Sequence, residues 1–156
     1  MNVAAGPDAE AYFARSGVSP QWRAFVQGVI ATLDEHLDAE GRTAMMRAVG
    51  ARMAEASPIS YADTLLGLES AMNDALAAIG WGYCALSVDM TERVLIIRHA
   101  VAPLVPAQSD RDGAWAGAVL EGLYGSWLLA QQGADAALSV RVESWSPGLA
   151  ILHYRR

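Results

Sequence analysis

The chain has 156 residues, the length of one ordinary domain with a sizeable core. Apolar residues make up 53% of it and charged residues only 18%, so the surface carries less charge than that of an average soluble monomer, and oligomerisation is the simplest explanation. The net charge of −6 argues against nucleic-acid binding, because neutralising phosphates requires a basic patch.

The lone Cys84 excludes an internal disulfide and a zinc site built on cysteines. The N-terminal stretch MNVAAGPDAEAYFARSG has neither the basic segment nor the apolar core of a signal peptide. No uncharged run approaches the roughly 20 residues that span a bilayer. We therefore expect the protein to be cytoplasmic.

The N-terminal part predicts an arm followed by a helix. Residues 1–18 are small and polar and are expected to form an arm with one helical turn at about residues 9–15, while residues 19–156 form one domain. Ser19 and Pro20 match an N-cap followed by a proline in the first helical turn. The helix runs to about residue 37, and its apolar residues share one face: Trp22, Phe25, Val26, Val29, Ile30, Leu33 and Leu37.

Two more helices are expected before residue 80. A break at residues 38–41 precedes a helix that runs toward Pro58. Ser60 starts the next one, because Asp63 completes a capping-box pattern, and Gly80 ends it in the conformation that favours glycine.

The remaining elements predict two β-hairpins separated by a helix. Residues 82–90 and 92–100 read as the first hairpin, and an irregular segment with two prolines follows. A helix spans about residues 113–132, and the strands ALSVRVES and GLAILHYR form the second hairpin. The order of elements indicates an α+β fold with a four-stranded antiparallel sheet.

The helix at 113–132 is apolar nearly all round, with glycines in its middle and one charged residue, Glu121, in the stretch VLEGLYGSWLLAQQG. Such a helix must be covered on nearly all sides. Its small-residue face is covered either by the chain's own helices or by a second copy of the chain, and the low charge content favours the second copy. The predicted interface residues are Trp115, Ala118, Gly122, Leu123, Gly125 and Trp127.

Residues able to support catalysis or metal binding are scattered. His36, His99 and His153 lack metal-ligand spacing and are expected to be ordinary, partly exposed side chains, although the last two could be neighbours across a sheet. The acidic clusters at 34–38 and 110–112 lie at helix ends, where solvated acids are common. No catalytic residue, cofactor site or metal site is predicted, and Trp81, Trp115, Trp127 and Trp145 are assigned to core or interface packing.

The segment ALAAIGWG (75–82), followed about forty residues later by VLEGLYGSWL (119–128), resembles the bacterial cellulose synthase operon protein D family over roughly residues 65–133. The resemblance implies a non-catalytic accessory protein that organises cellulose synthase complexes and aids export and crystallisation of glucan chains. It further implies a ring-like octamer built from dimers, with passageways for glucan chains. A scaffold on the cytoplasmic side of the inner-membrane synthase, with a proline-rich partner protein, fits the absence of a signal peptide better than a periplasmic location.

Contacts to glucan are expected at Tyr12, Phe13 and Arg15, because these residues lie in the polar arm and exposed aromatic faces can stack on sugar rings. Two other functions stay open. A small-molecule-binding α+β sensor domain would co-purify with a stoichiometric apolar ligand, and a carbohydrate-active enzyme would turn over soluble glucan oligomers.

Overall fold

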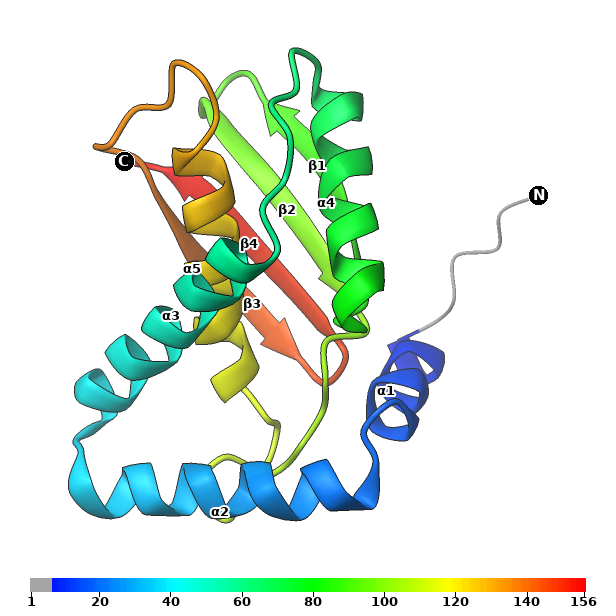
Figure 1. The fold of residues 1–156 in the computed structure, drawn as a ribbon, viewed down its shortest axis with the longest axis vertical. Coiled ribbons are helices and arrows are strands. Elements are labelled where there is room, and N and C mark those ends of the chain that lie inside the picture. The colour runs from blue at the N-terminus through cyan, green and yellow to red at the C-terminus, as the bar shows by residue number, and fades with distance from the viewer. Residues whose placement is uncertain (1–6) are drawn as a thin grey trace.

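A computed structural model describes residues 7–156. It confirms the α+β fold: a four-stranded antiparallel sheet lies behind helices α4 and α5, α3 crosses over α5, and α2 lies across one end of the molecule (Figure 1). The elements are α1 (Pro7–Ser16), α2 (Pro20–His36), α3 (Ala39–Ala56), α4 (Leu65–Ile79), β1 (Tyr83–Asp89), β2 (Val94–Ala100), α5 (Trp115–Leu129), β3 (Ser139–Ser146) and β4 (Leu149–Arg155). None of the helices in this range is long and apolar enough to cross a membrane.

The sheet has the strand order β1-β2-β4-β3, so the two predicted hairpins are joined through their central strands β2 and β4. The register aligns Leu86, Ile97 and Leu152 in one row across three strands. Ile97 and Leu152 are wholly buried, and they form the core together with the residues of α4 and α5 above them. One face of the sheet therefore builds the core, as is usual for antiparallel sheets.

The small-residue side of α5 is covered by α3 of the same chain. A Cβ atom on Gly122 would lie 1.9 Å from the carbonyl oxygen of Arg47, and one on Gly50 would lie 1.9 Å from that of Val119. No side chain fits at either position, so the two backbones cross closely because both crossing residues are glycines. This close packing offsets the cost of roughly 1 kcal/mol that each glycine carries in a helix relative to alanine.

Helix α5 begins at Trp115, two residues after the predicted start. The Asp110 carboxylate accepts hydrogen bonds from the backbone N–H groups of Ala114 (2.8 Å) and Trp115 (2.7 Å). Asp110 is 9% exposed, so this carboxylate caps a buried helix end that would otherwise leave its N–H groups unpaired.

Two predicted helix starts were misplaced. Helix α3 already begins at Ala39, with Asp38 accepting from the N–H of Gly41 at 2.7 Å, so the break before it is shorter than expected. Helix α4 begins at Leu65 with Thr64 as its N-cap, not at Ser60. The reason is tertiary: the Gln131 side chain accepts from the N–H of Ala62 (3.0 Å) and holds residues 60–62 against the end of α5.

Other local predictions are confirmed. The Ser19 hydroxyl accepts from the N–H of Trp22 at 3.4 Å and caps α2, and Gly80 ends α4 with φ of 68°. The N-terminal arm is more regular than predicted, because α1 extends from Pro7 to Ser16. Its buried Ala14 accepts a hydrogen bond from Leu104 at 3.2 Å, which attaches α1 to the body.

Candidate functional site

Helix α2 is attached to the body along a narrow strip. Ile30 is its fully buried residue. The side chains of Arg23 and Gln27 donate to the carbonyl oxygens of Leu104 (3.4 Å) and Pro106 (3.0 Å), so α2 is held largely by the segment that follows β2. In Figure 1 it lies along the lower end of the molecule, below α5 and away from the sheet.

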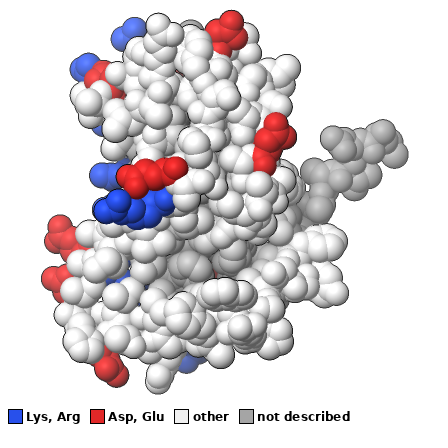
Figure 2. Space-filling model, in the orientation of Figure 1, with Lys and Arg blue, Asp and Glu red and all other residues white. Residues whose placement is uncertain are grey.

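Helix α2 leaves large apolar side chains in solvent. Trp22 is 58% exposed, Phe25 60% and Val29 36%, and the rings of Trp22 and Phe25 meet edge to face at 5.6 Å. Met45 and Val49 on the neighbouring helix α3 are also exposed. We call these five residues the apolar helix surface. Figure 2 shows few charged side chains on the viewed face over α2, with acidic ones at its left edge.

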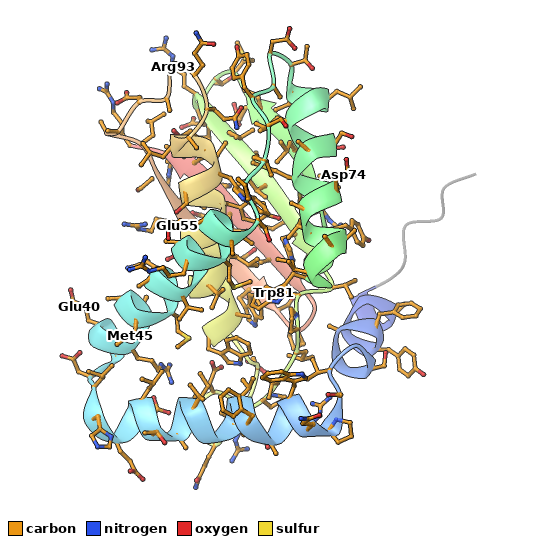
Figure 3. The ribbon with its side chains drawn as sticks, in the orientation of Figure 1. Glu40, Met45, Glu55, Asp74, Trp81 and Arg93 are labelled. Atoms are coloured by element: carbon orange, nitrogen blue, oxygen red, sulfur yellow. The ribbon has the colours of Figure 1, made fainter. Side chains whose placement is uncertain are left out.

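A groove lies between the corner of α1 and α2, the end of α4 and the start of α5. Its volume is about 480 Å³, within the range of ligand-binding clefts. Trp22, Trp81 and Trp115 line it, and the last two rings meet edge to face at 6.3 Å. We call it the tryptophan groove. Figure 3 labels Trp81 in the middle of the molecule, between α2 and the layered part.

The residues described in the lining of the tryptophan groove are uncharged. Apart from the three indoles they comprise glycine, aliphatic and proline residues and one hydroxyl, that of Ser19. The indole N–H of Trp115 donates to the carbonyl oxygen of Val105 at 2.9 Å, which fixes this wall. The sequence patterns do not predict this groove, because they assign Trp81 and Trp115 to packing; the signal that could have indicated it is the high tryptophan content, five in 156 residues.

The interface residues predicted on α5 lie in four environments. Trp115, Leu123 and Trp127 are buried inside the chain. Gly122 packs against α3. Gly125 is different: no atom lies within 4 Å of a Cβ placed on it, and it opens into a second groove of about 370 Å³. A subunit contact on α5 would therefore be made through Gly125. Ala118, the sixth predicted residue, is half-buried beside the cluster around Trp115.

Glu121, the single charged residue of α5, is buried between α3 and β3. Its carboxylate pairs with the Arg47 guanidinium of α3 and accepts from the N–H of Val142 in the edge strand β3 at 2.9 Å. The charge is therefore paired and hydrogen-bonded, as a buried carboxylate requires.

The other edge strand, β1, is covered in a similar way by α4. The Asn73 side chain accepts from the N–H of Cys84 (2.7 Å) and donates to its carbonyl oxygen (2.9 Å), and Glu69 accepts from the N–H of Leu86 (2.6 Å). An edge strand with free N–H and C=O groups invites pairing with another chain. Side chains thus occupy backbone groups of Cys84 and Leu86 on β1 and the N–H of Val142 on β3, which hinders strand addition at these positions.

His99 is wholly buried, which corrects the expectation of a partly exposed side chain. Its Nδ1 atom lies 2.5 Å from the Tyr124 hydroxyl, and burial lowers the pKa of His99 to about 4. Burial also raises the pKa of Cys84 to about 11 and the pKa of Tyr124 well above its usual value. These groups are neutral at pH 7 and belong to the core between the sheet and α5.

His99 and His153 are not neighbours. The register pairs His99 with Ala150 and His153 with Ile96, which places the two imidazoles on opposite faces of the sheet. His153 lies 3.6 Å from the Glu143 carboxylate on the face away from the helices.

The acidic clusters at helix ends have structural partners. Asp34 pairs with Arg42 at 2.7 Å and accepts from the Ser109 hydroxyl. Asp38 and Asp110 cap α3 and α5, as described above. Tyr12 and Phe13 are exposed on α1 with their rings edge to face at 5.6 Å, whereas the side chain of Arg15 lies outside the described part of the structure.

The chain is thus a small α+β domain whose main open features are an apolar helix surface and an adjoining tryptophan groove. It belongs to the family of the D-type subunit of cellulose synthase, whose model matches residues 8–155. It is 34% identical over 115 residues, 74% of each chain, to cellulose synthase operon protein D of Komagataeibacter xylinus and equally to that of Komagataeibacter sucrofermentans. Membership connects the chain with cellulose synthesis, and the match includes the N-terminal helices and the last hairpin, beyond the resemblance noted in the sequence.

Proposed function

We propose that the protein is a non-catalytic scaffold that assembles with copies of itself and organises cellulose synthase complexes, aiding export and crystallisation of glucan chains. The observation that supports this most is the apolar helix surface on α2 and α3. Monomeric soluble proteins rarely expose large contiguous apolar patches, and such patches commonly mark protein contacts. Because side chains occupy backbone groups on both edge strands, helix packing is the favoured mode of association.

The assembly that we propose is a ring built from dimers, an octamer by resemblance to the family. Trp22, Phe25 and Val29 supply its first contact, and the groove at Gly125 offers a second. Burying an exposed aromatic or aliphatic side chain contributes roughly 1.5–3 kcal/mol, so a few such residues on each copy stabilise a contact substantially. The synthase complex and the proline-rich partner protein would bind this assembly on the cytoplasmic side of the inner membrane.

The native mass, measured by light scattering across a dilution series, tests the proposal. The wild-type chain is expected to have a mass of several subunits. A variant with Phe25→Asp and Val29→Asp is expected to be a monomer with an unchanged circular dichroism spectrum, because two carboxylates would be desolvated in the contact.

Leu66→Asp is the matched control. Leu66 is 76% exposed on α4, outside the apolar helix surface, so this variant is expected to keep the wild-type mass. A wild-type chain that stays monomeric at every concentration would refute self-assembly. A double variant that keeps the wild-type mass would exclude α2 as the contact.

A further inference from the structure

We propose that the tryptophan groove is a binding site for a stretch of glucan chain, with pyranose rings stacked on the indoles of Trp22 and Trp81. Nothing in the family assignment points to this groove. The inference rests on the proposed function in one respect: cellulose synthesis is what brings a β-1,4-glucan to this protein. The site itself is argued from its charge, its aromatic walls and its rigidity.

The charge of the lining selects a neutral ligand. Of the 156 residues 28 are charged, 11 basic and 17 acidic, yet none of the described residues that line the groove is charged. A phosphate, a carboxylate or an ammonium group entering it would lose hydration without gaining an ionic partner from this lining, which is costly. A neutral polyhydroxy chain avoids this cost.

The aromatic walls match the two-sided character of a sugar ring. A β-linked pyranose presents apolar C–H faces and hydroxyl edges, and indoles offer large apolar faces with a polar N–H. Trp22 stands at the mouth with more than half of its surface in solvent, Trp81 is half-buried, and Trp115 closes the bottom. The Ser19 hydroxyl lies on the same lining and suits the hydroxyl edges.

A proline-rich peptide is the competing occupant, since such peptides also bind aromatic grooves. A peptide needs hydrogen-bond donors for its carbonyl groups, and the indole N–H of Trp115 is already bonded to Val105. The indoles of Trp22 and Trp81 and the Ser19 hydroxyl are therefore the donors that the lining offers. A glucan brings its own hydroxyl donors. Membership in a cellulose synthase family favours the glucan as the occupant, and the titration below includes the peptide as an outcome.

The groove is held in shape before any ligand binds. The N–H of Leu104 donates to Ala14 of α1, while Arg23 of α2 donates to the carbonyl oxygens of Leu104 (3.4 Å) and Val18 (3.5 Å). These bonds connect the corner of α1 and α2 to the segment that carries Pro103 and Val105, two residues of the lining. A preformed site avoids part of the ordering cost of binding.

The test is a titration of the purified full-length protein with cellohexaose, in which binding is monitored by calorimetry and by tryptophan fluorescence. Maltohexaose, whose α-linkages curve the chain, serves as the control ligand. We expect cellohexaose to bind and to change the emission, and maltohexaose to bind at least tenfold more weakly. Absence of cellohexaose binding, or equal binding of the two sugars, would overturn the proposal.

Trp22→Ala is expected to weaken cellohexaose binding at least tenfold, whereas Tyr83→Ala, which removes an exposed aromatic ring on the far face of the sheet, should change it less than twofold. Equal losses in both variants would refute the assignment. If Tyr12→Ala with Phe13→Ala abolished binding while Trp22→Ala did not, the glucan site would lie on α1. Displacement of cellohexaose by a proline-rich peptide of higher affinity would assign the groove to a peptide.

Ile79→Glu separates this inference from the proposed assembly. Trp22 belongs to both the groove and the apolar helix surface, but Ile79 lines only the groove. A carboxylate there is expected to lower cellohexaose affinity at least tenfold without changing the native mass. An assembled wild-type protein that binds no glucan would refute the groove and leave the scaffold standing. A monomer that binds cellohexaose through Trp22 would refute self-assembly and leave the groove standing.

Discussion

Helices α5 and α2 both carry many apolar residues, but the fold buries most of α5 and leaves most of α2 exposed. Helix α5 has ten buried residues out of fifteen and lies between the sheet and α3, while α2 has one buried residue out of seventeen and leaves two aromatic rings in solvent. The more apolar helix, α5, is therefore the one whose apolar surface is covered within the same chain.

This difference shows where a charge-poor surface comes from. The excess of apolar residues over the globular average is not explained by α5, because α3 and the sheet cover that helix. It is explained in part by the apolar helix surface on α2 and α3, whose five residues are more than a third exposed in the described structure. A search for the subunit contact should therefore begin at the helix of intermediate hydrophobicity, not at the most apolar one.

The largest expected effect comes from filling the crossing of α3 and α5. Gly122→Ala puts a methyl group where the carbonyl oxygen of Arg47 now lies, so we expect a loss of more than about 3 kcal/mol in the free energy of unfolding. Urea denaturation of the wild type and of the Gly122→Ala variant measures this loss. Gly125→Ala, one turn along the same helix, meets no atom and should instead gain up to about 1 kcal/mol. Similar stabilities for the two variants would contradict the close crossing.

Gly125→Leu then asks whether α5 also touches a second copy of the chain. The larger side chain would occupy the groove at Gly125 without disturbing the crossing with α3. If α5 contributes to the assembly as the sequence predicts, the native mass falls while the stability of the monomer is kept. An unchanged mass would restrict the subunit contact to the apolar helix surface.

Acid should destabilise the core between the sheet and α5 through protonation of His99. Its pKa is about 4 in the folded chain and near 6.5 when unfolded, so the unfolded state binds the proton more readily. This contribution to stability is complete above about pH 6.5 and is lost as the pH falls toward 4. Each pH unit costs about 1.4 kcal/mol, or roughly 3 kcal/mol in all. Denaturation of wild type and His99→Gln from pH 7 to 4 measures it, and a slope that survives the substitution would exclude His99 as the cause.

A smaller loss is expected at the buried ion pair. Glu121→Gln keeps the shape of the side chain and an acceptor for the N–H of Val142 but removes the charge that pairs with Arg47. We expect a loss of about 2 kcal/mol in the free energy of unfolding. Glu55→Gln is the control, since its pair with Arg52 is exposed and should contribute less than about 1 kcal/mol. Equal losses would mean that the burial of Glu121 has no energetic consequence.

Local chemistry predicted much of the fold, and tertiary contacts decided the rest. Ser19 with Pro20, Gly80 and the alternating strands marked elements that the structure confirms. The start of α4 was misplaced because Gln131, far along the chain, holds the segment around Ser60 extended. No local pattern could show this bond.

The candidate sites were harder to predict for a similar reason. The close crossing of α5 depends on Gly50, which lies in a different helix and carries no signal of its partner. The tryptophan groove collects side chains from α2, the end of α4, the segment after β2 and the start of α5. Periodicity assigns Trp22 and Trp115 to faces of their own helices, but it does not say which faces meet or that Trp81, in the turn after α4, lies beside them.

The smallest effect should appear at the cap of α2. Ser19→Ala removes the hydroxyl that accepts from the N–H of Trp22, at a cost of about 1 kcal/mol. Because α2 is attached by few buried contacts, the cost should appear as local opening: its amides exchange roughly fivefold faster while those of α5 keep the rate set by global unfolding. Ser16→Ala, which removes an exposed hydroxyl bonded within α1, is the control. If α2 instead exchanged at the rate of α5, it would be an integral part of the core, and its open apolar side would need an explanation other than assembly. If raising the protein concentration slows exchange in α2 alone, the helix that the chain leaves uncovered is the one that a second copy covers.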